Sequence, residues 1–266
     1  MPSGWKEKAE KLVQLLKLRE RPIAIKFLEK LGDIDTIAKI RKDDSILTTC
    51  QRFMQARVFG RTVAVTAYNT VPGCSFLMGL APVPENLKDG SMTTGMWCEK
   101  QEDARERFST FPIIPFGRHE ALVLSPLDRD YIDPEIILVY GNPQQIGLLI
   151  NGYQWKPYNL VKSIVTGGSS CAISVGNCYL TKEPSLAIPD YAEMRYAHAY
   201  EDELEIAFQA TDLDRILTGL EEISKKGMRY PIPVYGAEVS TYQGMPESYK
   251  ENIEKQLKEQ GRSTRS

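Results

Sequence analysis

Four consecutive apolar residues at 136–139, Ile-Ile-Leu-Val, constrain the fold more than any other feature of the chain. Alternate side chains of a β-strand point to opposite faces of its sheet, so a strand of this composition is buried on both faces. The segment from Glu135 to Tyr140 is therefore predicted to be a central strand. The tight turn Gly141-Asn142-Pro143 follows and leads into a helix, which makes half of a strand–helix–strand unit.

Other segments indicate the same mixture of strands and helices. Residues 5–18 carry apolar side chains at helical spacing, and the apolar run at 23–28 predicts a strand. We expect an α/β (mixed α+β) fold with one mixed β-sheet and helices packed on it. Residues 1–245 are predicted to form this single domain, and residues 246–266 a surface helix and a frayed tail.

Composition excludes several classes of protein. The 266 residues carry a net charge of only -2, so the chain lacks the basic field that attracts nucleic acid or an acidic membrane. No segment approaches the ~18 apolar residues of a membrane span, and the N-terminus lacks the apolar core of a signal peptide. We expect a cytoplasmic protein with no nucleic-acid or membrane partner, and we leave homo-oligomer formation open.

Three of the five cysteines stand where a helix is predicted to begin. Cys50 follows two threonines, and Cys171 follows a Gly-Gly-Ser-Ser run. Cys74 follows a Pro-Gly pair and precedes a short apolar segment with the length of one helical turn. Serine and threonine cap helix N-termini, and the helix dipole there favours thiolate over thiol. The pKa values of these cysteines are therefore predicted to be lowered, as suits metal ligands or nucleophiles.

The other two cysteines are weaker candidates. Cys178 lies seven residues after Cys171, two turns along the same face of a regular helix. A break at Gly176-Asn177 would bring it near enough to be a further ligand. Cys98 lies in a predicted charged helix, residues 97–108, and is assigned a structural role. For every cysteine the alternative is packing as a small apolar side chain.

A second set of residues points to an anionic ligand. Gly167, Gly168, Ser169 and Ser170 precede a predicted helix and resemble an anion-binding nest. They lack the lysine of a P-loop and the glycine spacing of a dinucleotide loop. Arg195 lies among several tyrosines, a combination that suits a carboxylate or phosphate. A plain tight turn and a solvated surface charge are the alternative interpretations.

The order of five short stretches carries a resemblance to a known family. The stretches are Cys50-Gln51-Arg52-Phe53 through Arg61-Thr62-Val63, Cys74 with Gly79-Leu80, Gly141-Asn142-Pro143 after a strand, Cys171 after the glycines, and Arg195 before Glu203-Leu204-Glu205-Ile206-Ala207. In this order they resemble the prokaryotic family known as domain of unknown function 169, over nearly the whole chain. The resemblance names no activity, but it implies anaerobic metabolism, which fits an iron–sulfur site. It also implies a further cysteine before Arg195. Residues 189–194 contain none, which leaves three matching thiols and Cys178 as a substitute.

Three hypotheses follow from these features. In the first, Cys50, Cys74 and Cys171, with Cys178 or an exogenous ligand, hold an iron–sulfur cluster of the 4Fe-4S type. Such a protein would exchange electrons with a redox partner or act as a Lewis acid on a small metabolite. In the second, the chain is a small-molecule or cofactor-binding module with Arg195 in its pocket and structural cysteines. In the third, it is a thiol-dependent enzyme with one activated cysteine.

Overall fold

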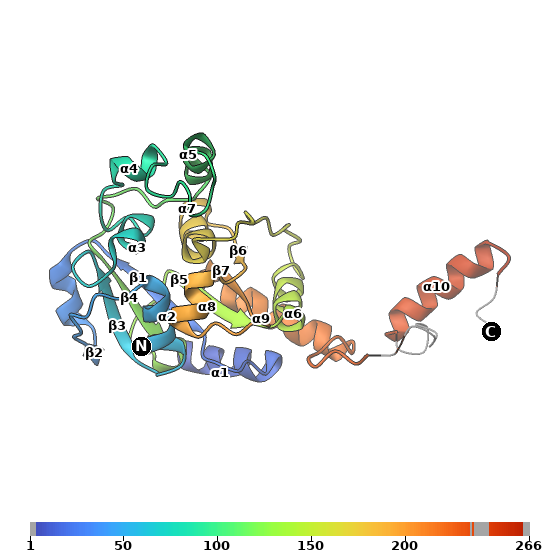
Figure 1. Ribbon diagram of the computed structural model, residues 1–266. Coiled ribbons are helices and arrows are strands. Elements are labelled where there is room, and N and C mark those ends of the chain that lie inside the picture. The colour runs from blue at the N-terminus through green and yellow to red at the C-terminus, as the bar shows by residue number, and fades with distance from the viewer. Residues whose placement is uncertain (1–3, 235, 237–244, 263–266) are drawn as a thin grey trace.

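The computed structural model describes residues 4–234, 236 and 245–262 of the chain. Its centre is one seven-stranded mixed sheet with the strand order β2-β3-β4-β1-β5-β7-β6 (Figure 1). The strands are β1 (Ile23–Leu28), β2 (Ile40–Arg41), β3 (Thr62–Thr66), β4 (Ala121–Pro126), β5 (Ile136–Gly141), β6 (Ser185–Ala187) and β7 (Leu204–Gln209). β2 and β3 pair in parallel, and the other neighbouring strands pair antiparallel. The predicted mixed α/β fold is confirmed.

The apolar run is the central strand expected from the sequence. β5 lies between β1 and β7, and Ile136 and Ile137 are both buried. β5 and β6 each run antiparallel to β7, which lies between them, so they are parallel to one another without being neighbours. The expected strand–helix–strand unit is therefore present in a split form, with β7 inserted.

Helices cover both faces of the sheet (Figure 1). One apolar layer joins Ile137 and Val139 of β5 to the helices α1 (Trp5–Leu16), α6 (Pro143–Tyr153) and α9 (Leu213–Lys225). The opposite layer joins Ile136, Leu138 and Tyr140 to α2 (Thr49–Arg57), α3 (Pro72–Leu77), the π-helix η3 (Ala172–Gly176) and α7 (Asn177–Thr181). Because alternate residues of β5 enter different layers, the strand ties the two halves of the core together.

The remaining elements lie around this core. They are η1 (Leu31–Thr36), α4 (Glu85–Lys88), α5 (Gln101–Ser109), η2 (Leu127–Arg129), α8 (Tyr191–Ala197), η4 (Ala210–Asp212) and α10 (Glu247–Glu259). α5 begins at Gln101, so Cys98 lies in the turn before this helix rather than within it. No residue of α10 is buried, and the helix lies apart from the sheet in Figure 1. Residues 263–266 of the expected frayed tail lie outside the described residues.

None of the described helices is long and apolar enough to cross a membrane.

Candidate functional site

Thr48 fixes the start of α2 and thereby the position of Cys50. The Thr48 hydroxyl accepts a hydrogen bond from the Gln51 amide at 3.0 Å, and the Gln51 side chain accepts one from the Thr48 amide at 2.9 Å. These reciprocal bonds satisfy two amides that a helix start otherwise leaves unpaired. Cys50 lies in the first turn of α2, as expected, and its side chain is buried.

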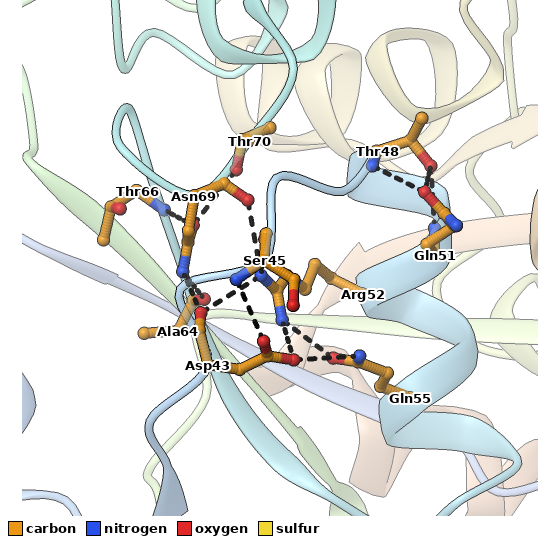
Figure 2. A network of polar contacts seen from close by, with 10 residues as sticks. All are labelled: Asp43, Ser45, Thr48, Gln51, Arg52, Gln55, Ala64, Thr66, Asn69 and Thr70. Atoms are coloured by element: carbon orange, nitrogen blue, oxygen red, sulfur yellow. Dashed lines mark hydrogen bonds and ion pairs between the residues drawn. The ribbon is translucent and has the colours of Figure 1, made fainter.

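The buried side chain of Arg52 joins α2 to two loops (Figure 2). Its guanidinium donates to the Asp43 carboxylate at 2.9 Å, to the Ser45 carbonyl at 2.6 Å and to the Asn69 carbonyl at 3.3 Å. The Asn69 side chain in turn donates to the Asp43 carbonyl at 3.2 Å. Hydrogen bonds from Ser45, with a contribution from Arg52, hold the pKa of Asp43 well below its usual range. The Asp43 carboxylate is therefore fully ionised at neutral pH.

The same two loops lead directly to Cys50 and Cys74. The Leu47 amide donates to the Asn69 carbonyl at 3.2 Å, and the Val71 amide donates to the Leu47 carbonyl at 3.0 Å. Val71 immediately precedes α3, and its carbonyl accepts a hydrogen bond from the Cys74 amide at 2.9 Å. α3 is the short helical turn expected around Cys74, whose side chain is half-buried. The Arg52 contacts therefore set the start of α2 against the start of α3.

The glycine-rich loop positions the third cysteine. Ser169 adopts a left-handed backbone conformation with a φ of 60°. Its carbonyl accepts hydrogen bonds from the amides of Ala172 at 2.9 Å and Ile173 at 3.1 Å, which begins a helical segment. This segment continues through η3 into α7. Cys171 lies in its first turn, as expected, and is buried.

The thiol of Cys171 affects the pKa values of Cys50 and Cys74. A hydrogen bond with Cys171 is the largest cause that raises the pKa of Cys50, followed by burial and by the charge of Glu193. Burial is the main cause that raises the pKa of Cys74 to about 12, and the charge of Cys171 adds to it. The prediction of lowered pKa values is wrong for Cys50 and Cys74, because burial and neighbouring ionisable groups outweigh the helix dipole. Both thiols are protonated at neutral pH.

These thiols are near one another, but their side chains do not have the positions of metal ligands. Among the described residues, no three histidine, cysteine, aspartate or glutamate side chains are positioned to hold a metal ion. A cysteine side chain has a single torsion to its sulfur, and rotation between its staggered positions changes where the sulfur points. Metal binding by Cys50, Cys74 and Cys171 therefore requires side-chain rotation.

Cys178 faces a different part of the core. Its thiol accepts a hydrogen bond from the Gln209 side chain of β7 at 3.3 Å, and burial raises its pKa to about 12. The charges that act on it belong to Asp212, Lys182 and Glu183. The intervening π-helix takes more residues per turn than an α-helix, so the seven-residue spacing no longer puts Cys178 on the face of Cys171. The break expected at Gly176-Asn177 is absent, because both residues keep right-handed helical backbone angles and the segment continues from η3 into α7.

The predicted ligand-binding residues do not all lie at one site. Arg195 is exposed on α8 and donates a hydrogen bond to the Tyr191 hydroxyl at 2.6 Å. Gly167, Gly168 and Ser169 instead line a cavity of about 220 Å³, together with Tyr191 but without Arg195. The arginine of this cavity wall is one that the sequence analysis did not single out, Arg107 of α5.

Two buried carboxyl groups behind the thiols were not indicated by the sequence. Glu193 accepts hydrogen bonds from Ser170 at 2.5 Å and from the Tyr140 hydroxyl, and burial raises its pKa to about 7. Burial, followed by the charge of Glu193, raises the pKa of Glu205 well above its usual value. Neither oxygen of Glu205 has a hydrogen-bond partner among the described residues, although the hydroxyls of Tyr140 and Ser174 lie near. The available signal for Glu205 was a carboxyl group beside the apolar run Ile206-Ala207-Phe208 of β7.

A second buried arginine, Arg57, holds the other end of α2. It donates to the Glu203 carboxylate at 3.0 Å and to the His198 carbonyl at 2.9 Å. Its guanidinium lies 3.9 Å from the centre of the Tyr140 ring. α2 is thus fixed at one end against the segment that joins α8 to β7 and at the other against two loops.

Comparison with known proteins bears out the family resemblance. The model of the family domain of unknown function 169, described as Uncharacterised ArCR, matches residues 11–219, which is most of the chain. No curated protein and no solved structure matches. Chemistry must therefore be argued from the site.

Replacement of Arg52 by methionine is expected to destabilise the fold strongly. Removal of one partner from a buried ion pair costs about 3–5 kcal/mol, because the other charge is left uncompensated. We expect the R52M variant to lose free energy of unfolding of this order in urea denaturation. The control is K42M, because the pair of Lys42 with Asp35 is exposed and its loss is expected to be nearly neutral. Equal losses in the two variants would contradict the role given to Arg52.

The raised pKa of Glu193 gives a pH dependence of stability with a definite sign. A carboxyl group with a higher pKa in the folded state favours folding while protonated, and this contribution is lost as pH rises from 4.5 to about 7. Glutamine keeps the size of the side chain but cannot ionise. The stability difference, E193Q minus wild type, is therefore expected to increase between about pH 5 and about pH 8 in urea denaturation.

The control for this experiment is E222Q. The pKa of Glu222 is lowered by its hydrogen bond with Lys225, so this group is already ionised across the range and its difference is expected to stay flat. A flat difference for E193Q as well would show that Glu193 does not titrate in this range.

Proposed function

The chain belongs to the Uncharacterised ArCR family, and within that family we propose that Cys50, Cys74 and Cys171 together bind a metal centre of the iron–sulfur type. Three segments that are up to 121 residues apart in the chain supply these thiols. Each thiol lies in the first turn of a helix or helical segment, where backbone amides point toward bound negative charge. The proposal concerns binding first, and chemistry at the centre second.

The observation that carries the proposal is that Cys50, Cys74 and Cys171 lie close enough to interact electrostatically. Cys171 raises the pKa of Cys50 and of Cys74, and burial raises both further. Three thiolates held together without a counter-charge would repel one another and would be costly to bury. A bound cation removes both penalties, since a thiol that coordinates a metal is deprotonated outright. The arrangement is therefore unfavourable for free thiolates and favourable for thiolates that share a metal.

Three protein ligands would leave one iron of a four-iron cluster without a cysteine. Cys178 is turned toward Gln209, and the Glu193 carboxylate is already engaged by Ser170 and Tyr140. An exogenous ligand is therefore the better candidate for the fourth position. An iron with an exchangeable ligand supports Lewis-acid chemistry on a small metabolite, whereas a fully cysteine-ligated cluster supports electron transfer alone.

A nucleophilic thiol enzyme is less well supported by the same geometry. A nucleophilic cysteine needs a lowered pKa or a neighbouring base. The pKa values of Cys50 and Cys74 are raised instead. The two histidines are engaged elsewhere, since His119 shares a hydrogen bond with the Met78 carbonyl and exposed His198 ends α8.

Purification without oxygen tests the proposal. We expect a brown protein that contains iron and acid-labile sulfide in equal and stoichiometric amounts. Serine in place of Cys50, Cys74 or Cys171 is expected to abolish most of the bound iron, because each removes one of three protein ligands. Cys98→Ser and Cys178→Ser are the matched controls, and both are expected to retain it.

Two results would contradict the proposal. One is a colourless protein that takes up no iron when reconstituted with ferrous iron and sulfide under the same conditions. The other is loss of iron in C98S equal to that in C50S, because half-buried Cys98 lies in the turn before α5 and outside the thiol cluster. Circular dichroism of each variant distinguishes loss of the centre from loss of the fold.

A further inference from the structure

The cavity of about 220 Å³ beside the thiol cluster has one wall built from the residues that precede two of the cysteines. Gly73 adjoins Cys74, and residues 167–169 lead to Cys171. We propose that this cavity binds a small carboxylate with a flat, apolar body, and that Arg107 pairs with the carboxylate. The cavity does not depend on the proposed metal centre, because none of its lining residues is a proposed ligand.

Much of the remaining lining is aromatic. Phe76 of α3, Trp97, Phe108 of α5 and Phe111 all line the cavity. The ring centres of Phe76 and Phe108 are 6.0 Å apart, and those of Phe108 and Phe111 are 6.2 Å apart, both in edge-to-face contact. Flat apolar groups extend such a cluster at ring separations of about 4.5–7 Å. Trp97 is 46% exposed, so its ring remains accessible from solvent.

The size of the cavity limits the class of ligand. Pockets for drug-sized ligands and cofactors occupy about 300–1,000 Å³. A cavity of about 220 Å³ is too small for a dinucleotide and fits a compact metabolite.

The Arg107 guanidinium is held in place by other side chains but forms no ion pair among the described residues. Its guanidinium lies 5.5 Å from the centre of the Trp97 ring and 5.1 Å from that of the Phe111 ring, so two aromatic faces orient it. Among the described residues, no carboxylate forms an ion pair with it, although the chain has more acidic than basic residues. A guanidinium carries five donors in a planar fork that matches a carboxylate.

Among the described residues that line the cavity, Asp190 is the one acidic side chain, and it has other partners. Asp190 accepts hydrogen bonds from the Glu193 amide at 2.9 Å and from the Ser170 amide at 3.2 Å. These bonds fix its carboxylate to the starts of α8 and of the Cys171 segment. Asp190 forms no ion pair with Arg107, so a ligand carboxylate would give the guanidinium the anionic partner that the described residues do not.

Gly168 allows the guanidinium to reach this position. A Cβ atom at residue 168 would lie 2.6 Å from Nη2 of Arg107, which is closer than real contacts permit. The side chain of Arg107 is flexible, so alanine at this position would displace the guanidinium rather than the fold. Gly168→Ala is therefore a second way to displace the guanidinium from the anion-binding position, and it keeps the positive charge of Arg107.

Ligand-observed NMR with three arylcarboxylates tests the inference. The probes are benzoate, phenylacetate and indole-3-acetate, each compared with its amide, which has the same shape and no charge. We expect at least one carboxylate to bind, with its amide weaker by about tenfold or more, as a charge-assisted bidentate contact implies. R107Q is expected to weaken the carboxylate by a similar factor and G168A to weaken it less. R105Q, an exposed arginine of the same helix outside the cavity, is the control and is expected to bind as wild type does.

The inference is overturned if none of the three carboxylates binds, if acid and amide bind equally, or if R107Q and R105Q bind alike. Iron content is measured on the same samples. Loss of carboxylate binding in R107Q with unchanged iron separates this site from the metal centre, and binding by iron-free protein shows that the cavity acts without it. Quenching of Trp97 fluorescence, absent in W97F, places a bound probe in the cavity.

Discussion

The buried guanidinium of Arg52 is the contact on which the rest of the site depends. α2 is a polar helix, yet seven of its nine residues are buried, including Arg52 and Arg57. A buried charge is tolerated only when it is paired and hydrogen-bonded. Arg52 meets this requirement by binding the backbone of two loops, and in doing so it joins the segment that carries Cys50 to the one that carries Cys74. The helix is held in the core by these polar contacts together with the apolar side chains of Cys50, Phe53 and Ala56.

The relative sizes of two effects explain why the pKa values of Cys50 and Cys74 are raised, although the dipole at a helix N-terminus alone would lower them. A helix dipole contributes about 0.3–1 kcal/mol at its N-terminus. Full burial shifts a pKa by up to about 3–5 units, at roughly 1.4 kcal/mol per unit. Burial therefore dominates at Cys74, whereas at Cys50 the hydrogen bond with Cys171 comes first, followed by burial and by the charge of Glu193. A metal would reverse the balance, since its charge acts at bonding distance on all three sulfurs.

Local features of the fold were predictable from the sequence, and long-range ones were not. The burial of β5 follows from four adjacent apolar residues, and the starts of α2 and of the Cys171 segment follow from threonine, serine and glycine. A role for Cys178 depended on a break at Gly176-Asn177, but the helical segment continues through both residues from η3 into α7. The Arg52 contacts span up to 17 residues and the cavity unites α5 with residues 167–169, so neither leaves a pattern in a short window. Arg195 is the opposite case, because the sequence indicated a feature that has no role in the cavity. Its contact with a tyrosine exists but lies on the surface.

Proton release on metal binding tests most directly whether the three thiols act as one unit. Metal-free protein is titrated with Zn²⁺ by calorimetry in two buffers of different ionisation enthalpy, near pH 7. Because Cys50 and Cys74 are protonated in the free protein, we expect at least two protons to be released per bound ion. The C50S variant is expected to release one fewer and C98S the same number. Binding without proton release, or release that is unchanged in C50S, would contradict the account.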